Sequence, residues 1–290
     1  MSRLLEPAFL RRLDALKRQL ASKVRSGSLG EGVAPRRGNS SEFREHRAYV
    51  AGDDPRRIDW NASARLGSPM LKLFQADEDR VIRLLVDSSA SLGFGTPSKL
   101  ESAQRLAAAL AYLALANSER AQVFVARSEA ATLGASSGGA RRGRAGFASI
   151  CRELERIEAQ GQLELARAID TVVARATRPG VLVTLSDFLD SSAYSTSLAR
   201  ARAAGHELIL IQILNQEELN PVLDGDYTLE DSETGATLSV TADSDTLTAY
   251  LTRLEEQQQS LKQFARRQGG TYVRCSSEQD LETTVREILG

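Results

Sequence analysis

The chain alternates short apolar runs with longer segments of helical periodicity. Helical spacing of leucine and alanine follows most of the runs, as in Leu100–Ala116. Runs that are apolar at consecutive positions are typical of strands buried on both faces, and such strands alternating with helices predict an α/β fold. We therefore expect a doubly wound, mostly parallel sheet with helices on both faces. The runs that predict its strands are Val81–Val86, Gln122–Ala126, Val181–Leu185, His206–Leu214 and Thr271–Cys275.

Two segments depart from this alternation. Residues 1–26 carry apolar positions at helical spacing and predict an N-terminal helix. Within residues 215–243, Tyr227–Asp231 and Thr237–Thr241 flank a turn sequence and predict a β-hairpin inserted at the edge of the sheet. The expected organisation is a helix over residues 1–26, an arm over residues 27–80, and an α/β domain over residues 81–290 that carries the insertion.

The arm contains too many aromatic residues for a flexible linker. Each large apolar side chain in it is worth about 1.5–3 kcal/mol when fully buried. We expect these side chains to pack the arm on the core, so that a chain beginning near Gln75 does not fold. Met70–Phe74 is expected to be an edge strand leading into the central strand. The side chains expected to be buried are Phe43, Tyr49, Ile58 and Trp60.

Charged residues are interleaved with these aromatic residues. Asp53 and Asp54 fall in a predicted turn between Gly52 and Pro55. The other charged side chains are expected to form a half-buried ion-pair network that clamps the arm on the sheet. The alternative is that the motif residues of the arm form a surface for a partner. The predicted network consists of Arg47, Arg57, Asp59 and Arg65.

Candidate chemistry lies where two of the predicted strands end. Asp87, Ser89 and Ser91 occupy alternate positions directly after the first core strand, and Asp187 follows Val181–Leu185. In an open α/β sheet, ligands bind outside the carboxyl ends of the strands, near the point where strand order reverses. Carboxylate and hydroxyl oxygens are ligands for hard cations such as Mg²⁺ and Mn²⁺. The competing interpretation is that the two serines only satisfy backbone groups in a strand-to-helix turn.

Several motifs between Glu42 and Ser91 carry a resemblance to a known family. They read E-F-R-x-H-R-x-Y, G-D-D-x-R-x-I-D-W, S-A-R and, after the apolar strand, D-S-S-A-S. This run resembles the bacterial domain of unknown function 58 family, whose members carry a von Willebrand factor A-like domain. The resemblance implies an assembly or chaperone-like role beside AAA+ ATPases of the MoxR type, with no established enzymatic activity.

The resemblance also bears on the metal site. In the metal-dependent A-domain pattern, called MIDAS-like here, a threonine and a later aspartate complete the site around D-x-S-x-S. The aspartate position matches Asp187, but Leu163 stands where the threonine is expected. The metal ligands implied are thus Asp87, Ser89, Ser91 and Asp187. One oxygen ligand is missing, which weakens the expectation of bound Mg²⁺ or Mn²⁺, because hard cations lose affinity with each lost oxygen.

Composition narrows the classes of function. A net charge of −1 gives no overall attraction to nucleic acid. No apolar run approaches the roughly 20 residues that span a bilayer, and the N-terminus lacks a signal-peptide pattern. Cys151 and Cys275 imply no disulfide framework, and His46 and His206 are too few for a zinc site. A cytoplasmic location is therefore expected.

Three classes of function remain. The first is a non-enzymatic adaptor that binds a protein partner, a MoxR-type ATPase or its client, at the Asp87–Ser91 edge. The second is the same scaffold with a vestigial metal site, which binds through the N-terminal arm. The third is a metal-dependent hydrolase, which is disfavoured because His206 begins a strand at the end opposite Asp87.

Overall fold

The computed structural model describes residues 3–25, 43–50, 53–55, 58–74, 80–126, 139–189 and 193–289. The chain forms two compact units. Unit 1 combines Met1–Pro35 with Arg80–Gly290, and unit 2 is Arg36–Asp79. The prediction that residues 27–80 pack on the core stays a prediction, and each unit is described by itself.

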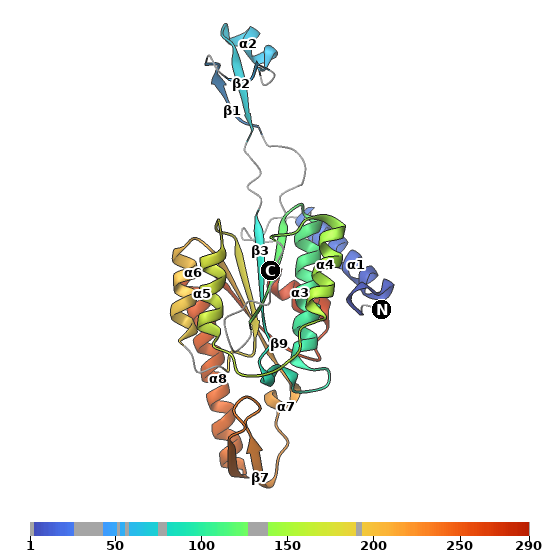
Figure 1. Cartoon of the computed structure of the whole chain (residues 1–290), viewed down its shortest axis with the longest axis vertical. Helices are drawn as coiled ribbons and strands as arrows, with labels where there is room; N and C mark the ends of the chain where they lie inside the picture. The colour runs from blue at the N-terminus through green and yellow to red at the C-terminus, as the bar shows by residue number, and fades with distance from the viewer. Residues whose placement is uncertain are drawn as a thin grey trace. The chain divides into compact units, whose positions relative to one another are not determined.

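Unit 1 is built on a five-stranded parallel sheet with the order β4-β3-β5-β6-β9 (Figure 1). The first strand of the sheet in the chain, β3, is second from one edge, with β4 on its outer side and the later strands added in turn on its other side. Strand order therefore reverses between β3 and β5, which confirms the predicted doubly wound sheet. The strands are β3 (Val81–Asp87), β4 (Arg120–Ala126), β5 (Val181–Ser186), β6 (Glu207–Leu214) and β9 (Thr271–Ser276).

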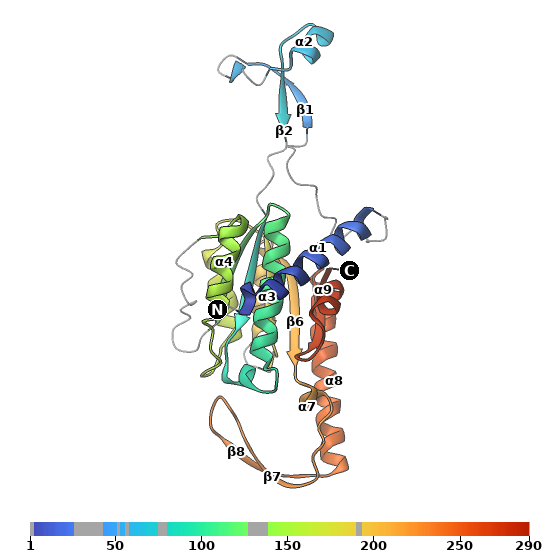
Figure 2. The ribbon, with the colours of Figure 1, turned by 90° about the vertical axis from the view of Figure 1, so that its right-hand side faces the viewer.

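Helices cover both faces of this sheet (Figures 1 and 2). Alternate residues of a strand point to opposite faces, so Leu84 packs in one hydrophobic cluster and Leu85 in the other. One cluster joins the sheet to η1 (Arg3–Leu5), α1 (Pro7–Arg25), α3 (Lys99–Ala116), α4 (Gly143–Leu154) and α9 (Leu281–Leu289). The other joins it to α5 (Leu165–Arg175), α6 (Tyr194–Ala203) and α8 (Ser244–Arg267).

The segment between β3 and α3 shapes the carboxyl end of the sheet. A short 3-10 helix, η3 (Ala90–Gly93), follows the strand, and the Ser98 hydroxyl then accepts a hydrogen bond from Glu101 N to begin α3. Ser98 is therefore the N-cap of α3. Gly95 has a φ of +91°, and an added Cβ there would collide with the Asn215 side chain. The turn therefore needs glycine, both for its backbone angle and for the close approach of Asn215.

The predicted hairpin insertion is present, preceded by a short helix, α7 (Gln216–Leu219). Its strands, β7 (Gly225–Glu230) and β8 (Thr237–Ala242), pair antiparallel with each other. Asp231 forms the turn by accepting hydrogen bonds from the backbone N–H groups of Glu233 and Thr234. Among the described strands the hairpin is a separate two-stranded sheet, so the expectation that it sits at the edge of the main sheet is wrong.

Unit 2 consists of an antiparallel pair, β1 (Phe43–Ala48) and β2 (Met70–Phe74), and a short helix, α2 (Trp60–Leu66). The expectation that Met70–Phe74 is an edge strand leading into the central strand is wrong, because it pairs with β1. Asp59 begins α2 by accepting hydrogen bonds from two backbone N–H groups, as an N-cap does. Trp60 remains 69% exposed, so unit 2 does not itself bury the ring that was expected to be an anchor.

Candidate functional site

The site lies where the strand order reverses, at the carboxyl ends of β3 and β5. Asp87 is the last residue of β3, and Asp187 follows the last residue of β5. The two strands are hydrogen-bonded neighbours, with Val86 paired to Leu185. The structure therefore brings together the four residues predicted as a site from two segments about a hundred residues apart: Asp87, Ser89, Ser91 and Asp187.

Asp87 is fully engaged by neighbouring donors. Its Oδ1 accepts a hydrogen bond of 2.8 Å from Ser89 N, and its Oδ2 accepts one of 2.5 Å from the Ser186 hydroxyl. Burial, followed by the negative charge of Asp187, raises the pKa of Asp87 to about 7, while the hydrogen bonds oppose this rise. Ser186 was not predicted as part of the site.

The two serines form a short chain of hydroxyls that ends on Asp187. The Ser89 and Ser91 hydroxyl oxygens are 3.0 Å apart, and Ser91 donates a 2.9 Å hydrogen bond to Asp187 Oδ2. Ser89 is buried, whereas Ser91 is half-buried. The side chains thus do more than cap a turn, because they link the end of β3 to the end of β5.

A buried lysine completes the cluster. The Lys99 side chain is 1% exposed, and its ammonium lies 2.8 Å from Asp187 Oδ2 and 2.6 Å from Glu218 Oε1. Burial, the largest influence, lowers the pKa of Lys99, but the two carboxylates outweigh it and the pKa is raised. The site therefore contains a cation that belongs to the protein itself.

The sequence held one signal for Lys99. It occupies the first position of α3, where the positive end of the helix dipole disfavours a lysine. A lysine at that position indicates a specific anionic partner. Glu218 gave a weaker signal as the third helical residue of the capping box that begins with Asn215. Neither residue was predicted as part of the site.

The backbone that carries Asp187 is held in an uncommon conformation. Phe188 is a buried residue with a φ of +57°, which is unfavourable for a bulky side chain. Gln212 donates a 2.9 Å hydrogen bond to the Asp187 carbonyl, and Gln257 donates one of 2.6 Å to the Phe188 carbonyl. These contacts from β6 and α8 fix the direction of the loop, so Asp187 is presented by a rigid support.

The arrangement does not fit a divalent cation as it stands. Asp187 Oδ2 already accepts from the Lys99 ammonium and the Ser91 hydroxyl, and both oxygens of Asp87 are engaged. Leu163 is buried in the hydrophobic cluster beneath the sheet and offers no oxygen. In the part of the chain that the structure describes, no group of three or more His, Cys, Asp or Glu side chains is arranged to hold a metal ion. The metal prediction stays a prediction.

Apolar side chains flank the polar cluster. Phe94, just after η3, is 48% exposed, and Leu189, two residues after Asp187, is 51% exposed. Exposed apolar side chains beside a buried polar cluster are typical of surfaces that bind a protein. The edge thus combines a rigid polar centre with apolar flanks.

The motif residues of unit 2 form a different arrangement from the predicted network. Arg47 Nη2 lies 2.8 and 3.0 Å from the two carboxylate oxygens of Asp53, and Asp59 Oδ2 lies 2.9 Å from His46 Nε2. The backbone N–H of Val50 and the Arg47 guanidinium lower the pKa of Asp53. Arg65 contacts the Asn61 carbonyl, 3.4 Å away. These contacts lie within unit 2.

Three other motif positions complete the description of unit 2. Asp54 is exposed and has a partner, Trp60 is exposed on the first turn of α2, and Arg57 lies outside the described residues. The predicted network of Arg47, Arg57, Asp59 and Arg65 stays a prediction; in the described residues Arg47 pairs with Asp53, and Asp59 caps α2.

One histidine and two cysteines of unit 1 lie outside the polar cluster. His206 precedes β6, at the end of the sheet opposite Asp187, as predicted. Burial, then the charge of Arg83, lowers its pKa. Cys151 and Cys275 are buried free thiols, and burial raises the pKa of each to about 12. They are accordingly unreactive structural residues.

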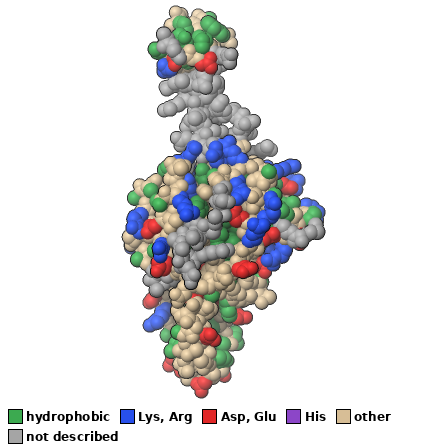
Figure 3. Space-filling view, viewed as in Figure 1, with side chains coloured by type: hydrophobic (Ala, Val, Ile, Leu, Met, Phe, Trp, Pro, Cys, Tyr) green, Lys and Arg blue, Asp and Glu red, His purple; other side chains and the backbone are tan. Residues whose placement is uncertain are grey.

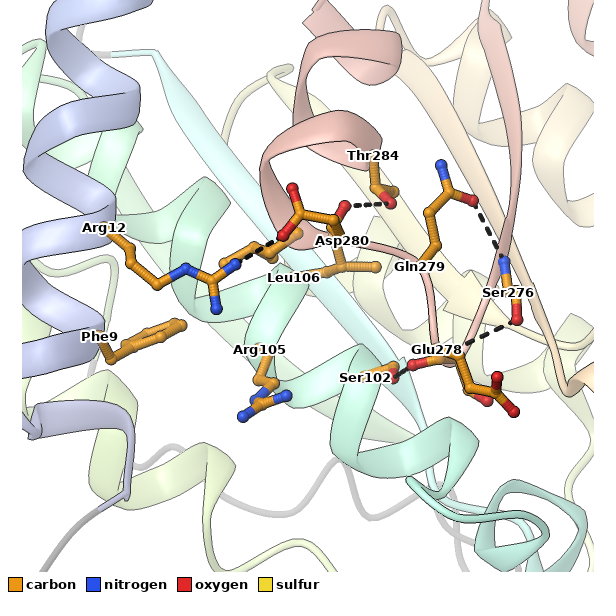
Figure 4. Close-up of a pocket in the computed structure, with 12 residues that line it drawn as sticks. Phe9, Arg12, Ser102, Arg105, Leu106, Ser276, Glu278, Gln279, Asp280 and Thr284 are labelled. Carbon is orange, nitrogen blue, oxygen red and sulfur yellow. Dashed lines mark hydrogen bonds and ion pairs between the residues drawn. The ribbon is translucent and has the colours of Figure 1, made fainter.

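A polar cavity of about 170 Å³ lies between α1, α3 and the start of α9 (Figure 4). Arg12 reaches from α1 to Asp280 and to Glu282, at 2.8 and 2.5 Å. The Ser102 hydroxyl donates a hydrogen bond to the Ser277 carbonyl across it. Because the polar groups of this cavity connect α1 to α9, we interpret it as part of the interface, called here the polar seam, between the N-terminal helix and the rest of unit 1.

The chain is thus an α/β protein with a cluster of polar side chains at the point where the strand order of its sheet reverses. Comparisons with known proteins place it in a family. The family model described as "Protein of unknown function DUF58" matches residues 45–260. The chain is 34% identical over 233 residues to uncharacterized protein Mb1516 of Mycobacterium bovis, covering 79% of this chain and 71% of that one. Uncharacterized protein Rv1480 of Mycobacterium tuberculosis matches to the same extent. The chain belongs to the DUF58 family, which confirms the resemblance.

Solved structures with a similar arrangement have low sequence identity. The conserved hypothetical protein BatB from Bacteroides thetaiotaomicron is 14% identical with a TM-score of 0.43, covering 72% of this chain and 97% of that one. A von Willebrand factor type A structure from Catenulispora acidiphila is 16% identical with a TM-score of 0.34, covering 47% and 34%. These similarities concern the fold alone.

Among the helices that the structure describes, none combines the length and apolar character needed to cross a membrane. The cytoplasmic location stays a prediction.

Proposed function

We propose that this protein is a non-enzymatic adaptor or assembly factor that binds a protein partner at the edge formed by Asp87, Ser89, Ser91 and Asp187. The observation that carries the proposal is the position of this cluster at the switch point, flanked by exposed Phe94 and Leu189. Exposed aromatic and aliphatic side chains such as these two can supply the apolar part of an interface, and the polar cluster beside them can supply its hydrogen bonds. The family membership is consistent with an interaction role.

The proposed docking does not require a metal ion. In the cluster, Lys99 supplies the positive charge that balances Asp187 and Glu218. The polar centre is therefore pre-formed, and a partner meets a rigid surface without the cost of ordering it. The described histidine of unit 1 does not accompany the serines, because it precedes β6 at the opposite end of the sheet.

A second candidate surface is favoured by one observation. Unit 2 leaves three large apolar side chains exposed, at 58% for Val50, 69% for Trp60 and 61% for Leu66. This supports the alternative in which the partner binds through the N-terminal arm. The partner we propose in either case is a MoxR-type AAA+ ATPase, on the family resemblance.

Two exposed leucines separate the two surfaces. We would measure binding of the purified ATPase to the parent chain, to Leu189→Asp and to Leu66→Asp by calorimetry. We expect Leu189→Asp to weaken binding at least tenfold and Leu66→Asp to leave it unchanged, because a charge placed in an apolar contact must be desolvated. The reverse pattern would identify unit 2 as the docking surface. Equal binding by all three chains would contradict both surfaces.

A further inference from the structure

The β7–β8 hairpin returns to the body of unit 1 at its tip. All residues of β7 are exposed, including Leu229 at 46%, and Leu238 on β8 is 65% exposed. Within the turn from Asp231 to Ala236, only Glu233 is half-buried. Figure 2 shows the hairpin curving back toward the end of the sheet that carries η3. The hairpin is therefore exposed along β7 and at its turn, except at Glu233, while Val240 and Ala242 are covered toward the end of β8.

Glu233 lies against the hydroxyl groups of Ser89 and Ser91. These serines belong to the docking edge, the polar edge proposed above to bind a partner. The Glu233 carboxylate lies close enough to the hydroxyls of Ser91 and Ser89 and to Asp187 for each of them to shift its pKa. Burial, the largest influence, raises the pKa of Glu233, the two hydroxyls lower it, and Asp187 raises it.

The charge of the insertion is consistent with such a role. Residues 215–243 contain eight acidic residues (Glu217, Glu218, Asp224, Asp226, Glu230, Asp231, Glu233 and Asp243) and neither lysine nor arginine. On the face shown in Figure 3, Lys and Arg side chains gather over the body of unit 1 and are scarce at the hairpin end. Of these acidic side chains, the hairpin turn presents Glu233 to the serines.

We infer that the β7–β8 hairpin is an internal occupant of the docking edge, and that Glu233 holds the place of an acidic side chain of the partner. The inference rests on the proposed function and names the chemistry that the edge recognises. An acidic side chain on an exposed loop of the partner takes the place of Glu233 beside Ser89 and Ser91 once the hairpin tip has left. Binding at the edge is then a competition between the protein's own carboxylate and the partner's.

The test compares Glu233→Ala with Glu230→Ala, an exposed acid three residues earlier on the same hairpin. Hydrogen exchange of the full chain is followed at Ala90–Gly93 and at the turn. We expect Glu233→Ala to accelerate exchange at both segments and Glu230→Ala at neither. Equal exchange in the parent and Glu233→Ala would overturn the inference.

A binding measurement provides the second readout. The probe is a labelled synthetic peptide with the sequence of residues 225–242, and its control carries alanine in place of Glu233. If the tip occupies the edge nine-tenths of the time, Glu233→Ala should bind the probe about tenfold more tightly than the parent. The control peptide should bind neither chain. Equal binding of the probe by the parent and Glu233→Ala would contradict the internal occupant.

The two proposals fail in distinguishable ways. If Leu189→Asp abolishes ATPase binding while Glu233→Ala changes neither exchange nor peptide binding, the edge docks a partner and the hairpin inference is wrong. If Glu233→Ala exposes Ala90–Gly93 while Leu189→Asp leaves ATPase binding intact, the hairpin contact is real and the proposed function is wrong.

Discussion

At the scale of single residues, the buried Lys99 ammonium is the most consequential group in the protein. It lies between Asp187 and Glu218, and its side chain is 1% exposed. Burying charges is costly, and the pairing offsets that cost only while both signs are present. Removing the ammonium would leave Asp187 buried beside Asp87, whose own pKa is already raised to about 7 by burial and by that neighbour.

Lys99→Met is therefore expected to destabilise the protein by about 3–5 kcal/mol, because it strands a buried carboxylate while keeping the length of the side chain. Urea unfolding followed by circular dichroism measures the loss. Lys262→Met, at an exposed lysine of α8, is the matched control and should cost less than about 0.5 kcal/mol. Similar losses in the two variants would mean that the Lys99 pairing is not energetically important.

The same residue makes the metal question testable. In Lys99→Met the freed carboxylates are available to a divalent cation, so millimolar Mg²⁺ or Mn²⁺ should raise the Tm of this variant more than that of the parent. A cation at 100 times its Kd stabilises the folded state by about 2.7 kcal/mol. Adding Asp87→Ala should remove the effect. A clear metal-dependent rise in the parent that disappears in Asp87→Ala would show that a cation binds alongside the ammonium.

At the scale of elements, α1 is joined to the rest of unit 1 by two different forces. Leu13 and Leu16 are buried in the hydrophobic cluster of α3 and α9. Arg12 adds ion pairs to Asp280 and Glu282 along the polar seam of Figure 4. The apolar contacts supply most of the stabilisation, because Arg12 is 45% exposed and solvent screens its charge.

The ion pair should nevertheless give α1 a dependence on pH. The hydrogen bond from Arg12 is the largest influence that lowers the pKa of Glu282, to about 2 in the folded protein. A depressed carboxyl pKa contributes stability above its unfolded value of about 4.3, and this stability is lost as the pH falls toward 2.

We therefore expect the parent to have a higher Tm than Glu282→Gln at pH 6 and low salt, and the difference to disappear near pH 2. Glu278→Gln, at an exposed acid beside the same cavity, should show no such trend. A Tm difference that stays constant from pH 6 to pH 2 would contradict the role of the ion pair.

The elements of unit 1 were predictable because their physical causes are local. Apolar runs long enough for one strand, and helices capped by residues such as Ser98, need no knowledge of distant contacts. The partner of Met70–Phe74 was not predictable, since strand pairing is set by tertiary contacts. The four predicted site residues could be assigned to the site because they directly follow strands of the sheet. Lys99 and Glu233 could not be assigned in this way. The contacts of each join the site to the insertion, so they depend on how distant parts of the chain fold together.

At the scale of the whole molecule, the described residues that form the two hydrophobic clusters of unit 1 all come from that unit. The N-terminal helix contributes Phe9, Leu13 and Leu16 to the core of unit 1. A chain that begins near Gln75 is therefore still expected not to fold, but for a further reason. It lacks α1, which contributes to the core, as well as unit 2.

Two shortened chains separate these contributions. The first replaces residues 36–79 with a flexible Gly/Ser linker of about ten residues and keeps α1. We expect it to fold with a Tm within a few degrees of the parent, because the cores of unit 1 remain complete. The second begins near Gln75 and loses the three buried apolar side chains of α1. Each is worth about 1.5–3 kcal/mol against a total stability of about 5–15 kcal/mol, so this chain should be molten or insoluble. Thermal unfolding and near-ultraviolet circular dichroism measure both. If the chain without residues 36–79 also fails to fold, unit 2 is required for the stability of unit 1, and the original expectation of an arm packed on the core is supported.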